Sequence, residues 1–135
     1  MAGRESLNHT GNELALMLEH KKPLSMFYDD ADVSDEESVI PEREFDEFVR
    51  NGLMIKEEMV FTLQNNPKTG RSCRVKYVLY ALANEQWRIP AMFLAIKTML
   101  RIGRADEGID RMMSALLGYT DEQIDAFVQQ RRAAG

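Results

Sequence analysis

The sequence has little of several residue types that would point to a particular chemistry. Among its 135 residues it contains one cysteine, Cys73, and two histidines, His9 and His20. A single cysteine cannot form an internal disulfide and is typical of a protein in a reducing compartment. The eight glycines and four prolines are too few for a collagen-like or low-complexity chain.

Long hydrophobic runs are also absent. The most apolar stretch, 89–102, is interrupted by Lys97 and Arg101, so no segment reaches the ~18 apolar residues of a membrane-spanning helix. The first ten residues lack the hydrophobic centre of a secretion signal. We therefore expect a cytoplasmic protein with no membrane contact.

Composition and length indicate an ordinary globular domain. Hydrophobic residues make up 44% of the chain and charged residues 29%, and the length corresponds to one domain of ~100–200 residues. The expected organisation is a flexible leader over 1–10, a single domain over 11–132 and a tail over 133–135. No internal repeat is visible.

Alternating apolar residues predict a β-hairpin with strands at 53–64 and 71–82. In both arms the apolar residues stand mostly at odd positions and the polar residues mostly at even ones. For both apolar sets to face one core, odd positions must lie opposite odd positions across the ladder. A five-residue turn over 66–70 meets this condition and pairs Phe61 with Val75.

The rest of the chain is expected to be mainly helical. Helices are predicted from Asn12 towards Pro23 and from Pro41 to Arg50, with a short strand over 24–28 between them. Three more helices begin near Pro90, Asp106 and Thr120, the last with a capping box to Gln123. The predicted fold is α+β: a small, mainly antiparallel sheet of about three strands, covered by helices and followed by a C-terminal three-helix segment.

Acidic residues are concentrated in one segment. Residues 29–47 contain ten acids and one base, Arg43, whereas 59–84 contain four bases and no acid. A calcium loop starting at Asp30 is excluded, because Asp35 stands where the loop needs glycine and Pro41 where it needs a bidentate glutamate. The sequence predicts no metal site and no cofactor, so the segment is either a solvated surface or a contact for a basic partner.

The function that we favour is a protein-interaction domain whose partner has a basic surface. An inhibitor, an antitoxin-like protein or an adaptor would use such a contact. The expected contact residues are the acids of 29–37: Asp29, Asp30, Asp32, Asp35, Glu36 and Glu37. The edges of a three-stranded sheet also allow two copies of the chain to pair as a homodimer.

A nucleic-acid-binding module is the alternative. The hairpin places four bases near its tip and on its outer face: Lys68, Arg71, Arg74 and Lys76. Phosphates bind to such residues, and Tyr80, expected on the same outer face, would stack a base. Against this stand the net charge of −5 and the lack of a glycine-rich loop.

Signals for an enzyme are weaker, and no catalytic residue is assigned. Neither histidine has a partner nearby in the sequence, and Cys73 is expected to face the core. Glu57 is the only charge on the apolar side of the hairpin, opposite Leu79. It is either desolvated beside a pocket, as an enzyme would use it, or it lies at the sheet edge or beside an arginine such as Arg88.

Two further expectations concern the core of the helical half. Trp87 is expected to cover the core, with Arg88 binding helix carbonyl groups. Four methionines in this half share apolar faces with their neighbours and are expected to pack inside: Met92, Met99, Met112 and Met113.

Overall fold

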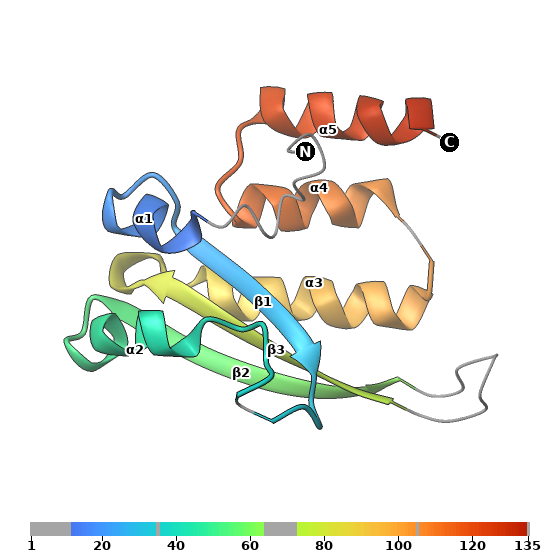
Figure 1. Ribbon diagram of the computed structural model, residues 1–135. Helices are drawn as coiled ribbons and strands as arrows, with labels where there is room; N and C mark the ends of the chain where they lie inside the picture. Colours follow the sequence, from blue (N-terminus) through green and yellow to red (C-terminus); the bar gives the residue numbers. More distant parts are fainter. Residues whose placement is uncertain (1–11, 35, 64–72, 105, 135) are drawn as a thin grey trace.

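The protein is described here by a computed structural model that covers residues 12–34, 36–63, 73–104 and 106–134. The predicted α+β organisation is confirmed, with three antiparallel strands and a C-terminal helical segment (Figure 1). None of the helices in these ranges is both long and apolar enough to cross a membrane. In chain order the elements are α1 (Glu13–Leu18), β1 (Leu24–Asp30), α2 (Glu42–Arg50), β2 (Met54–Leu63), β3 (Cys73–Leu82), a 3₁₀ turn η2 (Ala83–Glu85), α3 (Arg88–Ile102), α4 (Glu107–Leu116) and α5 (Asp121–Ala134).

The sheet has the order β1-β3-β2, so the second arm of the hairpin is its central strand. The predicted register of the hairpin is confirmed, with Phe61 opposite Val75 and Glu57 opposite Leu79. The turn over 66–70 that was expected to set this register lies outside the described residues. β1 pairs antiparallel with the other side of β3, where Leu24 lies opposite Ala81.

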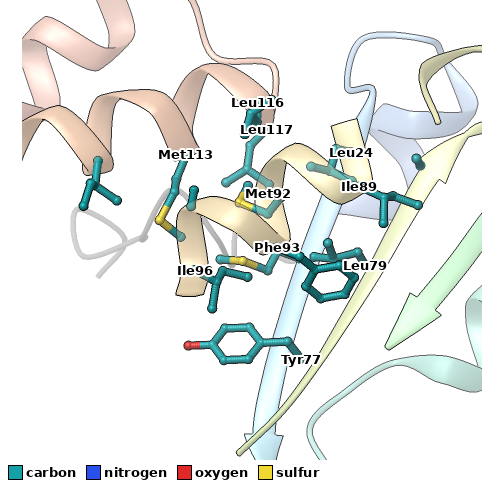
Figure 2. Close-up of a cluster of buried hydrophobic side chains, with 14 residues drawn as sticks. Leu24, Tyr77, Leu79, Ile89, Met92, Phe93, Ile96, Met113, Leu116 and Leu117 are labelled. Carbon is teal, nitrogen blue, oxygen red and sulfur yellow. The ribbon is translucent and has the colours of Figure 1, made fainter. Parts of the chain in front are cut away.

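The larger core lies on the face of the sheet that carries the odd residues of β2 and β3 and the even residues of β1. α3 packs on this face, α4 packs on α3, and α5 lies beyond α4 (Figure 1). Figure 2 shows side chains of α3 between β3 and α4, among them Met92 and Ile96, which are completely buried. The predicted apolar faces of the hairpin and of the three C-terminal helices therefore meet in one cluster.

The opposite face of the sheet is also buried along the C-terminal half of β3, which corrects the expectation that the even residues of the hairpin form an outer face. Val78 and Tyr80 of β3 have no exposed surface and pack with Phe27 and Phe45 beneath α1 and α2. The signal was present in the sequence, because residues 77–82 form a continuous apolar run. Such a run is typical of a central strand that is covered on both faces.

Most helix ends follow the sequence. The capping box of α5 is formed, with the Thr120 amide donating to the Gln123 side chain at 2.8 Å and the Gln123 amide donating to Oγ1 of Thr120 at 3.2 Å. α3 ends at Gly103 in the left-handed conformation, as predicted. α1 is shorter than expected, because the chain turns at His20, whose φ is 60°.

Two cations from distant parts of the chain bind the C-terminal carbonyl groups of α4. Lys22, which the sequence placed at the end of the first helix, is buried and donates to the carbonyl of Leu117 at 3.2 Å. Arg88 donates to the carbonyls of Ala115 and Leu116 at 3.2 and 3.0 Å, as predicted. Because the last carbonyl groups of a helix have no partner within it, these cations stabilise the helix end.

Three side chains expected in the core are exposed instead. Cys73 is the first residue of β3 and is exposed, as is Arg74 beside it. This end of β3 extends beyond the helices that cover the rest of the strand (Figure 1). Trp87 is 57% exposed and does not cover the core. Its ring packs against the guanidinium of Arg88, whose Cζ lies 4.6 Å from the ring centroid. Met112 is 52% exposed on the outer side of α4, whereas Met92 and Met113 are buried.

Candidate functional site

The first residues of the predicted acidic contact hold their own loop in place. The carboxylate of Asp29 accepts hydrogen bonds from the amides of Val39 at 2.9 Å and Asp30 at 2.7 Å. The bond from Val39 is the main reason why the pKa of Asp29 lies below its ordinary value. This bond joins two residues ten positions apart, so it connects the two ends of the loop between β1 and α2.

Other acids of the segment pair with the basic hairpin. Asp32 bonds Arg74 at 3.0 Å, and the Ala31 amide donates to the Arg74 carbonyl at 2.9 Å. The carboxylate of Asp30 accepts a bond from the amide of Asp32 at 2.9 Å. The acidic and basic segments, 42 residues apart at this pair, therefore lie side by side and neutralise each other in part.

Glu42 at the start of α2 is the centre of a second neutralised group. It contacts Lys56 at 2.6 Å and Lys76 at 3.5 Å. Burial alone would raise the pKa of Glu42, but the hydrogen bond and charge of Lys56, together with Lys76, bring it below its ordinary value. Two of the four bases of the nucleic-acid alternative, Arg74 and Lys76, are thus engaged within the protein.

Three acids without an ion pair to a described residue lie beside the N-terminal half of α2. A hollow of about 610 Å³ is bordered by acids of the loop and the helix, with Arg43 and the already paired Lys56 as its only bases among the described residues. Within the described chain, Glu36, Glu44 and Asp46 form no ion pair. We call this site the acidic hollow and define it by Glu36, Glu42, Glu44 and Asp46.

A buried hydroxyl group lies close to the same acids. Tyr80 has no exposed surface, and its hydroxyl is the one buried side-chain polar atom without a hydrogen-bond partner in the described residues. Burial raises the pKa of Tyr80 far above its ordinary value, and the nearby charges of Glu42, Asp46 and Glu58 raise it further. The ring of Tyr80 thus lies in an environment that favours its neutral form.

The position of Tyr80 corrects its predicted role. Its ring stacks on Phe45 at 4.2 Å between centroids and meets Phe27 edge-on at 6.1 Å. A ring enclosed in this way cannot stack a nucleic-acid base. Of the remaining residues of the two predicted contacts, Lys68, Arg71 and Asp35 lie outside the described residues, while Glu36 and Glu37 are exposed.

A second hollow lies on the other face, between β2 and α3. It has a volume of about 630 Å³ and is lined mainly by apolar side chains, including Met59, Trp87 and Leu94, with Gln86 and Lys97 as further polar lining residues. Glu57 borders it and is exposed, so it lies at the sheet edge, as one of its two interpretations predicted. Arg88 is not its partner, because it bonds Glu85 at 2.7 Å. We call this site the apolar groove.

A metal centre is not found at either hollow among the described residues. Within the described residues there is no group of three histidine, cysteine, aspartate or glutamate side chains that could hold a metal ion. No protein-family model matches the chain, and no curated protein or solved structure is similar to it. Function is therefore argued from the geometry of the two hollows.

The sequence located the acids but not the site that they form. It favoured 29–37 because the charge is densest there, yet Asp29 and Asp32 are used inside the protein. A signal for α2 was available, because Glu42 and Asp46 are four residues apart and such residues share a helix face. That Glu36 joins them depends on how the loop folds, which the sequence pattern does not reveal.

Proposed function

We propose that the protein is an interaction domain that binds a protein partner with a basic surface at the acidic hollow. The observation that carries the proposal is the gathering of Glu36, Glu44 and Asp46, without bases of their own, at a hollow with room for several side chains. Lysine and arginine side chains are the groups that such a surface attracts. The same charge repels the phosphates of a nucleic acid from this hollow.

The proposal shifts the predicted contact along the chain. Glu36 remains in it, whereas Asp29 and Asp32 serve the loop itself, and the acids of α2 replace them. Binding through a compact acidic surface suits an inhibitor, an antitoxin-like protein or an adaptor. The single cysteine in the sequence supports a reducing, cytoplasmic location for this interaction.

Removing two charges from the acidic hollow tests the proposal. The Glu36→Gln/Glu44→Gln variant is used to capture proteins from a lysate of the source cells, beside the wild-type chain. We expect it to retain about tenfold less of a stoichiometric protein partner, because each surface charge contributes up to ~1 kcal/mol to such contacts. Quantitative mass spectrometry of the eluates measures the difference.

The matched control removes two exposed acids elsewhere, as Glu19→Gln/Glu122→Gln, and should capture the partner like the wild type. Equal capture by both double variants would place the contact outside the acidic hollow. Nuclease treatment is applied to every lysate, and loss of the captured material on this treatment contradicts a protein partner.

A further inference from the structure

We propose that the free edge of β2 takes up an extended segment of the partner as a fourth strand. In this arrangement, which rests on the proposed function, apolar side chains of the segment enter the apolar groove and alternate basic side chains reach the acids beside α2. The segment that this edge recognises is an extended strand in which apolar and basic residues alternate. Three features of the sheet carry the inference.

The first feature is the direction of the backbone groups of β2. Bonds from Ala31 to Arg74 and from Leu82 to Pro23, at 2.9 and 3.0 Å, show that even residues of β3 face β1. In an antiparallel ladder the odd residues of β3 then face β2, in agreement with the bond from Ala83 to Leu53 at 3.0 Å. Odd residues of β2 lie opposite odd residues of β3, so the odd residues of β2 use their amide and carbonyl groups to bond β3. The amide and carbonyl groups of the even residues of β2 therefore point to the free edge.

The second feature is the length and accessibility of this edge. β2 has ten residues, and in the sheet order β1-β3-β2 no other described strand lies beside it. Among the described residues none accepts a hydrogen bond from the amides of Lys56, Glu58 or Val60. Such a row of unpaired backbone groups is a template for an added strand.

The third feature is the difference between the two sides of the edge. Side chains of an added strand alternate between the faces of the sheet. On the α3 side they meet the apolar groove, where Trp87 and Leu94 are 57% and 65% exposed. On the α2 side they meet the exposed Glu58, which shares its face of β2 with Lys56, the ion-pair partner of Glu42 at the start of α2.

These charges favour a basic segment over a second copy of the chain. If two β2 strands paired antiparallel about a two-fold axis near their middle, Glu57 and Glu58 of one copy would meet the same residues of the other. Like charges on adjacent strands destabilise a sheet. Lysine or arginine side chains on the α2 side pair with Glu58 instead.

The test uses two fluorescent peptides of equal composition and the full-length protein. One peptide alternates, acetyl-Lys-Val-Lys-Val-Lys-Val-Lys-amide, and the other has its four lysines before its three valines. Fluorescence anisotropy should show at least tenfold tighter binding of the alternating peptide, because only this peptide presents lysines and valines to opposite faces. Equal affinities overturn the proposal.

A proline substitution tests the backbone hydrogen bonds of the β2 edge without changing any charged side chain. Val60→Pro removes an amide that points to the free edge and breaks no bond to β3, a position where strands accept proline. We expect it to weaken binding of the alternating peptide at least tenfold, whereas Val60→Thr, which keeps the amide, changes it less than twofold. If Val60→Pro loses the circular dichroism of the wild type, Leu94→Gln on the exposed side of α3 replaces it, with an expected fivefold loss.

The outcomes distinguish this inference from the proposed function. If Glu36→Gln/Glu44→Gln reduces partner capture while Val60→Pro and Leu94→Gln bind the alternating peptide like the wild type, the added strand is wrong and the acidic hollow stands. A dimer in analytical ultracentrifugation that Val60→Pro dissociates also overturns the inference, because a second copy then occupies the edge.

Discussion

The Gly118→Ala variant is expected to lose about 3 kcal/mol of its free energy of unfolding. Gly118 ends α4 with a φ of +97°, and an added Cβ would lie 2.4 Å from Cδ of Pro23. The left-handed conformation costs a non-glycine residue ~1 kcal/mol or more, and overpacking costs a further 1–3 kcal/mol. A proline ring cannot rotate away, so the clash moves the backbone of one of the two turns.

Gly103→Ala is the matched control. Gly103 also has a positive φ, +73°, but nothing lies within 4 Å of its missing Cβ. This variant should lose only about 1 kcal/mol, the conformational part of the effect. Urea unfolding followed by circular dichroism measures both. Equal losses would show that the close approach of Pro23 and Gly118 does not contribute.

The pH dependence of stability should reveal the buried Lys22 at the same junction. Burial lowers the pKa of Lys22 from 10.5 to about 8, although the charge of Glu13 opposes this. Between these pH values the unfolded chain holds a proton that the folded protein has released. The free energy of unfolding therefore increases with pH in this window, by about 2 kcal/mol between pH 8 and 10.

At higher pH two buried tyrosines act in the opposite direction. Burial raises the pKa of Tyr77, with a contribution from Tyr28, and raises that of Tyr80 further. The unfolded chain then loses its phenolic protons first, so stability decreases above pH 10. The expected profile increases from pH 8 and declines beyond about pH 10.

Two lysine variants assign the increase. Lys22→Met should abolish the gain between pH 8 and 10, whereas Lys21→Met, at a side chain 68% exposed, should retain it. Urea unfolding at each pH measures the free energies. If the free energy of unfolding of Lys22→Met still increases between pH 8 and 10, another group causes the increase and the account of this junction is wrong.

Local patterns were sufficient to predict most of the fold. The alternation of the hairpin fixed its register, and Thr120 and Gln123 identified the start of α5, because each depends on neighbours in the chain. Lys22 was misplaced for the opposite reason. Its environment is the end of α4, 95 residues away in the sequence, and no local pattern specifies that contact.

The candidate site was harder to predict because charge density does not reveal pairing. Asp32 and Arg74 belong to segments that the sequence assigned to two competing functions, yet they bond each other. Tyr80 was assigned to an outer face because the polar residues at even positions, Arg74 and Lys76, end only four residues before it. The acidic hollow needs the loop after β1 and α2 to be brought together, and the bond between Asp29 and Val39 does this.

The most direct test of the central claim is a nuclear magnetic resonance titration of the isotope-labelled protein with the alternating lysine-valine peptide. We predict amide shifts over 36–46, beside the acidic hollow, and over 56–60 along β2, both diminished at high salt as expected for surface charges. Residues of α5 should be unaffected. Shifts confined to regions outside α2, its preceding loop and β2 would contradict the proposed binding site.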